Sequence, residues 1–88
     1  MTEREFVISN KLGMHARPAA LFVHEATRFK SSIMVSKDGL EINGKSVMGL
    51  MLLAAESGSK LKIRADGADE KQALEALAKL FERRFDEE

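Results

Sequence analysis

The only proline of the chain, Pro18, fixes where the first helix begins. Proline lacks a backbone N–H, and helices tolerate it in the first turn, where that N–H would have no partner. Apolar residues continue at helical spacing from Ala16 to Phe29. The pattern therefore predicts a helix that starts at residue 15 or 16, with His15 as the N-cap or its neighbour.

Four short runs of strand-forming residues accompany this helix, at 5–9, 32–36, 40–43 and 60–65. The last of them alternates apolar and charged residues and is the clearest strand in the sequence. Asp38-Gly39 joins the second run to the third, and this dipeptide favours a tight hairpin because both turn positions need positive φ.

Two further helices follow the hairpin. Ser46 can cap a short apolar helix over residues 47–53. Asp69 with Gln72 resembles a capping box, and the apolar residues after it predict a helix to about Phe85.

The element order is thus β-α-β-β-α-β-α, which predicts an α+β fold. Its economical form is a two-layer open-faced sandwich, with three helices on one face of a four-stranded, mainly antiparallel sheet. The first helix connects two strands that cannot form a tight hairpin, so we expect the last strand to lie between them. With 88 residues, the chain should form one domain over residues 1–88.

Composition excludes several classes of function. Lys plus Arg equals Asp plus Glu, 14 each, which argues against a nucleic-acid binder. There is no cysteine, so neither disulfides nor a thiolate metal site are available. No cofactor or metal is expected, and His24 lies too far from His15 to share an ion with it. No stretch approaches the roughly 20 apolar residues of a membrane span, and we expect a cytoplasmic protein.

The segment Gly13-Met14-His15-Ala16-Arg17-Pro18-Ala19 concentrates reactive groups. A helix N-terminus offers unpaired N–H groups and a positive dipole end, which favour anions. This field and the Arg17 charge disfavour a charged ring, so we expect His15 to be a neutral nucleophile. The Arg17 guanidinium can reach a phosphoryl group on the ring. Gly13 permits close approach of a partner's backbone.

Taken alone, this pattern also fits a histidine that merely caps a helix and an arginine that is solvated. Two motifs favour the reactive interpretation. The segments 13–20 and 43–51 resemble the active-site signature and the second motif of HPr, the phosphocarrier family of the bacterial phosphoenolpyruvate-dependent phosphotransferase system. The resemblance extends over nearly the whole chain and implies the same open-faced sandwich.

The resemblance also implies specific roles. His15 would take a phosphoryl group on Nδ1 from phosphorylated enzyme I and pass it to EIIA-type acceptor domains, without independent turnover. Arg17 would contact the phosphoryl group and the partner. The protein would act as a monomer, and its docking surface would contain apolar side chains near the site, namely Phe22, Val47, Met48 and Met51.

Ser46 corresponds to a serine that a dedicated HPr serine kinase phosphorylates in many members of this family. Capping alone is also sufficient reason for a serine at this position. Two alternatives to the sugar-uptake carrier therefore remain: a carrier of the nitrogen or regulatory branch that uses the same His15, and a regulatory binding module switched at Ser46. Pro18 fits the sugar type better, the tract 51–55 fits it less well, and purely regulatory members have replaced the active histidine.

A Walker-like segment and an acidic end of the sequence do not indicate further sites. Residues 39–46 match the Walker A pattern, but Gly39 belongs to the hairpin and the residues after it should be a strand, so we reject a nucleotide site. The acidic segment Asp86-Glu87-Glu88 is expected to be a solvated, frayed tail.

Overall fold

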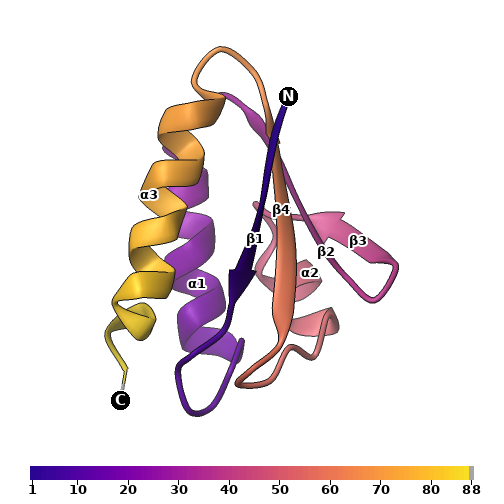
Figure 1. Cartoon of the computed structure of the whole chain (residues 1–88), viewed down its shortest axis with the longest axis vertical. Helices are drawn as coiled ribbons and strands as arrows, with labels where there is room; N and C mark the ends of the chain where they lie inside the picture. Colours follow the sequence, from indigo (N-terminus) through magenta and orange to yellow (C-terminus); the bar gives the residue numbers. More distant parts are fainter. Residues whose placement is uncertain (88) are drawn as a thin grey trace.

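One layer of the molecule is a sheet of four strands, and helices cover one of its faces (Figure 1). The computed structural model describes residues 1–87. The strands are β1 (Thr2–Val7), β2 (Ser32–Lys37), β3 (Leu40–Asn43) and β4 (Lys60–Asp66). The helices are α1 (Ala16–Ala26), α2 (Val47–Leu52) and α3 (Glu70–Glu82), followed by the short 3-10 turn η1 (Arg84–Asp86).

The strand order is β1-β4-β2-β3, and every neighbouring pair is antiparallel. The last strand in the chain therefore lies between β1 and β2, as the element order predicts. Alternate residues of β4 point toward the helices, and Leu61, Ile63 and Ala65 are fully buried. The predicted α+β sandwich is confirmed.

The turn between β2 and β3 has the predicted chemistry. Asp38 has φ 51° and Gly39 has φ 87°, which are the positive values that a two-residue hairpin requires. Because β3 covers Leu40–Asn43, the middle of the Walker-like segment is a paired strand and not a phosphate-binding loop.

Several element ends differ from the sequence-based expectation. β1 ends at Val7 and not at residue 9, and α3 ends at Glu82 and not at about Phe85, which lies in the separate turn η1. β1 begins at Thr2 because this residue already pairs with Ala65 of β4. α1 ends at Ala26, and the expected continuation to Phe29 is wrong: the N–H groups of Arg28 and Phe29 donate to carbonyls only three residues back. Such bonds tighten the last turn and end an α-helix.

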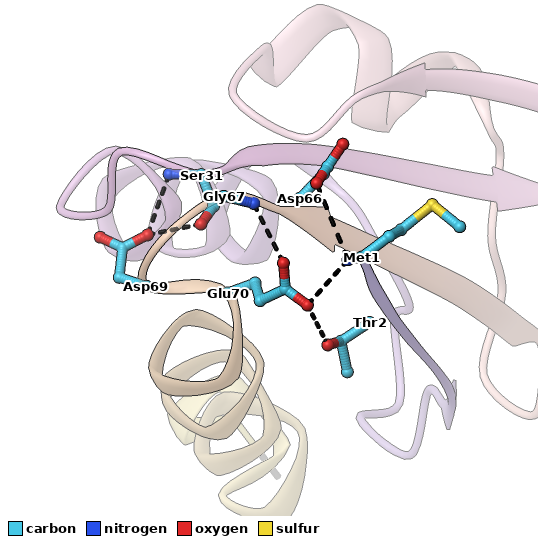
Figure 2. A network of polar contacts seen from close by, with 7 residues as sticks. All are labelled: Met1, Thr2, Ser31, Asp66, Gly67, Asp69 and Glu70. Atoms are coloured by element: carbon cyan, nitrogen blue, oxygen red, sulfur yellow. Dashed lines mark hydrogen bonds and ion pairs between the residues drawn. The ribbon is translucent and has the colours of Figure 1, made fainter.

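The predicted capping box at the start of α3 is also wrong. Asp69 makes no cap bond. Its carboxylate accepts from the backbone N–H of Lys30 at 2.9 Å and from that of Ser31 at 3.0 Å (Figure 2). The neighbouring Glu70 accepts from Gly67 N–H at 3.1 Å and also binds Thr2 Oγ1. The carboxylate of Asp69 thus binds a distant loop in place of a local cap.

The core lies between the sheet and the helices and contains four packed phenylalanines, two of them near the end of the chain. Phe81 stacks on Phe6 with ring centroids 4.8 Å apart and meets Phe85 edge-on at 5.0 Å. Phe22 of α1 packs edge-on against the same Phe81 ring. This cluster anchors η1 beside the N-terminus of α1.

Candidate functional site

His15 is the N-cap residue of α1, as Pro18 predicts. Its backbone is extended, with φ −89° and ψ −172°, and its side chain makes no cap hydrogen bond. The carbonyl oxygen of His15 accepts the first helical bond, from Ala19 N–H at 3.0 Å. The imidazole is therefore not occupied in closing the helix and is free for chemistry.

The helix end next to His15 has backbone N–H groups without a hydrogen-bond partner in the described part of the chain. Within residues 1–87, the N–H groups of Ala16 and Arg17 donate to no backbone carbonyl, and Pro18 has no N–H. The first N–H groups of any helix lack partners inside it. Together with the positive end of the helix dipole, they favour an anion at this position.

Gly13 brings the chain into α1 against another loop of the same protein. Its φ is +72°, and a Cβ built on it would lie 2.4 Å from Ala55 O. The next residue, Met14, donates its N–H to the same carbonyl at 2.8 Å. The unusual backbone expected of Gly13 at the entry to α1 is observed, and the backbone that approaches it closely is that of residues 55–56 of this chain.

The imidazole of His15 meets a carboxylate. Its Nε2 lies 2.9 Å from Glu87 Oε2 and 3.1 Å from Glu87 Oε1. Asn10, which is fully buried, donates from Nδ2 to Glu87 Oε1 at 2.9 Å and to Gly13 O at 2.8 Å. The side chain of Glu87 is only 14% exposed. The prediction of a solvated tail is therefore wrong for Glu87; Glu88 lies outside the described residues.

Glu87 remains ionised in this position. Burial raises the pKa of its carboxyl group, but hydrogen bonds from His15 and Asn10 and the charges of His15 and Arg17 outweigh burial, so the net shift is downward. The imidazole thus has one negative partner besides the helix end and Arg17, which the sequence did not indicate.

Arg17 is exposed at the first turn of α1. It lines an open surface groove of about 510 Å³ together with Lys11, Leu12, Asp86 and Glu87. Two cationic side chains in this groove can approach an anion bound at the helix end. The arrangement suits a small anionic group that is held at the surface and not enclosed.

The predicted docking residues divide between surface and core. Met48 is 77% exposed and Met51 is 44% exposed on α2, and Val47 is half-buried. Phe22 has no exposed area, so its predicted docking role is wrong: the face of α1 that carries it packs on Phe81. Sequence reasoning missed Leu52 and Leu12, which are 70% and 71% exposed; the helical position of Leu52 beside Met48 and Met51 was an available signal.

Ser46 is the N-cap of α2, and its Oγ accepts from Gly49 N–H at 3.1 Å. Lys45 donates from Nζ to Phe29 O at 2.8 Å, so its side chain binds the loop after α1. His24 is exposed. Residues 1–87 contain no group of three side chains suited to a metal ion, and none of their helices has the length and apolarity to cross a bilayer.

Comparison with known proteins gives a consistent result. The family model described as "PTS HPr component phosphorylation site" matches residues 2–83. A phosphocarrier protein HPr from Xylella fastidiosa is 48% identical over 88 residues, covering 100% of this chain and 99% of the relative. An HPr-like protein Crh from Halalkalibacterium halodurans is 49% identical over 83 residues, covering 94% and 99%. The crystal structure of HPr from Thermoanaerobacter tengcongensis superposes with a TM-score of 0.96 at 49% identity, covering 100% and 99%.

Proposed function

The chain belongs to the PTS HPr family and is similar to its phosphocarriers, which are not enzymes, and we propose that it relays a phosphoryl group on His15. The donor is phosphorylated enzyme I, and the acceptors are EIIA-type domains that serve sugar uptake. The setting is the cytoplasm, where both partners act.

One observation carries the proposal: the ring of His15 stands at the N-terminus of α1 without capping it. The unpaired N–H groups of Ala16 and Arg17 lie at the same helix end. An uncharged imidazole nitrogen there can attack phosphorus, and the phosphoryl oxygens gain hydrogen bonds and a favourable dipole on arrival.

The transfer needs little from this chain besides position and charge. The bond between Nδ1 and phosphorus forms while the bond between phosphorus and the donor breaks, and the donor keeps the bonding electron pair. Arg17 offers its guanidinium to the phosphoryl oxygens. In the second transfer the roles reverse, and Nδ1 becomes the leaving group.

Docking brings the donor and the acceptor to the same place. We assign it to the exposed apolar side chains of α2, Met48, Met51 and Leu52, with Val47 at its edge. Methionine side chains are flexible and suit a surface that must fit more than one partner. We propose that the protein acts as a monomer.

Incubation with enzyme I and phosphoenolpyruvate, followed by intact-mass measurement, tests the proposal. We expect one acid-labile, base-stable phosphate, its absence from His15→Ala, and its retention in the control His24→Ala, whose exposed imidazole lies on the same helix. A phosphate that persists in His15→Ala, or an unmodified natural protein, would contradict it.

We further propose that the acceptor belongs to the sugar branch and not to the nitrogen branch. A carrier of the nitrogen branch would use the same His15 and differ only in its acceptor. Phosphorylated protein mixed with a sugar-type or a nitrogen-type EIIA domain should transfer faster to the sugar type. Preference for the nitrogen-type domain would assign the chain to the other branch.

Regulation at Ser46 is a second candidate role. It is favoured by the half-exposed position of Ser46 directly before the docking residues of α2, and by similarity to a relative named HPr-like protein Crh. A phosphate there adds about two negative charges beside the docking surface. Incubation with an HPr serine kinase and ATP should give an acid-stable phosphate that Ser46→Ala lacks.

A further inference from the structure

The turn after α3 is shaped so that Glu87 meets the imidazole of His15. Arg84, Phe85 and Asp86 all have positive φ, between 53° and 59°, and this reverses the chain after the helix. Phe85 is 1% exposed and packs against Phe81. The N–H groups of Asp86 and Glu87 donate to the carbonyls of Arg83 and Arg84, each at 2.9 Å. The reversal is thus anchored in the core and hydrogen-bonded.

The contacts of Glu87 fix the direction of each hydrogen bond. A carboxylate can only accept, and the amide Nδ2 of Asn10 can only donate, so Asn10 is a donor to Glu87. The imidazole Nε2 lies within 3.1 Å of both carboxylate oxygens and must therefore carry a hydrogen. In an uncharged imidazole only one nitrogen does so.

We propose that Glu87 is a positioning residue that holds the imidazole of His15 in the Nε2–H tautomer and leaves the lone pair on Nδ1. The inference rests on the proposed phosphocarrier function and adds the reason why Nδ1 is the nitrogen that attacks. Asn10 holds the carboxylate in place and joins it to Gly13, the residue that shapes the approach to α1.

The proton balance of the transfer is then simple. Nδ1 already has its lone pair when the phosphoryl group arrives, so no base has to remove a proton from it. The Nδ1–P bond forms, the donor leaves with the other electron pair, and the hydrogen stays on Nε2 throughout. The imidazole becomes more positive as it accepts phosphorus, and the carboxylate on the opposite side of the ring stabilises that charge. The positive side chains of Lys11 and Arg17 line the same groove as the negative Glu87.

The tautomer can be measured in the unphosphorylated protein, without any partner. Histidine labelled with ¹⁵N is observed by NMR at a pH above the ordinary titration range of the imidazole. We expect the His15 Nε2 signal to be that of a protonated nitrogen and Nδ1 that of an unprotonated one. In Glu87→Ala the Nδ1–H form should appear in the average shifts, and transfer from enzyme I should be several-fold slower.

Two variants separate this role from a general structural one. Glu87→Gln keeps an acceptor oxygen and should retain the natural tautomer. Glu82→Gln changes an exposed carboxylate at the end of α3, outside the groove, and should leave the ring signals unchanged. An Nδ1–H imidazole in the natural protein, identical ring signals in Glu87→Ala, or loss of the tautomer in Glu87→Gln would overturn the inference. The ring signals are measured without phosphoryl transfer, so the two proposals can fail separately. The tautomer can be the wrong one while His15 is still phosphorylated, and the tautomer can be as expected while His15 is not phosphorylated.

Discussion

A single residue, Gly13, sets the path of the chain into α1. Because it has no Cβ, the chain can pass close to another loop before the helix begins. The carbonyl of Ala55 occupies the space that a side chain would need and accepts the N–H of Met14. The position of His15, one residue further on, depends on this approach. The sequence predicts that a glycine is needed here, but it does not identify residues 55–56 as the neighbour, because that contact spans some forty positions of the chain.

A comparison of two glycines isolates this contact. Gly58 has φ +92° with nothing within 4 Å of its absent Cβ, whereas Gly13 has φ +72° and a backbone oxygen at 2.4 Å. Each substitution by alanine costs about 1–3 kcal/mol for the left-handed backbone. Urea unfolding should show that Gly13→Ala is clearly more destabilising than Gly58→Ala, because only Gly13→Ala adds a clash. Equal losses would mean that the loop moves aside at no cost.

Arg17 should affect transfer and not folding. Its side chain is exposed and lines the groove beside Glu87, so Arg17→Ala removes a phosphoryl contact without opening the core. Stopped-flow transfer from enzyme I should slow by roughly tenfold or more, the scale of one charge-assisted hydrogen bond. Arg28→Ala, beyond the other end of α1, is the control, and an equal rate in both variants would remove Arg17 from its assigned role.

Among the helices and strands, the sequence predicts β3 and the cap of α2, which depend on neighbouring residues. It does not predict the start of α3, which depends on contacts with a distant segment. Strand β3 occupies the predicted residues 40–43 because the Asp-Gly turn sets its start. The cap of α2 by Ser46 is likewise predicted and observed. The capping box of Asp69 fails because its carboxylate finds two backbone donors at residues 30–31, which no pattern around residue 69 indicates.

Substitutions of Ser46, at the start of α2, can distinguish the effect of a negative charge on docking from the effect of the helix cap. Asp, Asn and Ser are about equally good N-caps, so Ser46→Asp and Ser46→Asn should both keep the helix. Only the aspartate adds negative charge beside Met48 and Met51. Titration calorimetry with enzyme I should show weaker binding for Ser46→Asp and natural affinity for Ser46→Asn. If both bind alike, charge at this position does not control docking.

At the scale of the whole molecule, contacts between segments far apart in the chain decide what the sequence cannot predict. Glu70 joins the start of α3 to Thr2 and to the amino group of Met1 (Figure 2). Glu87 joins η1 to His15 over 72 positions. The polar composition of the acidic segment predicts a solvated tail. The burial of Phe85 overrides that composition and brings Glu87 to the site.

The Glu70 contacts make stability depend on pH. The hydrogen bond from Thr2, then those from Gly67 N–H and the amino group of Met1, lower the pKa of Glu70 from 4.5 to about 2. A lowered folded-state pKa means that the stabilisation is complete above the unfolded value of 4.5 and is lost as pH falls toward about 2. Thermal unfolding should therefore show Glu70→Gln less stable than the natural protein at about pH 7, with the difference shrinking toward about pH 2.

Glu75→Gln is the matched control, because Glu75 is an exposed carboxylate on the same helix. Its unfolding temperature should stay close to that of the natural protein across the same pH range. A difference for Glu70→Gln that stays constant or grows toward acid pH would rule out these contacts as the source of the effect.

The decisive measurement identifies which ring nitrogen of His15 carries phosphorus. The protein is labelled with ¹⁵N in histidine, phosphorylated with enzyme I and phosphoenolpyruvate, and observed by NMR for coupling between ³¹P and the ring nitrogens. The geometry of Glu87 on Nε2 predicts coupling to Nδ1 of His15, with a hydrogen still on Nε2. Phosphorus on Nε2, or on a residue other than His15, would contradict it.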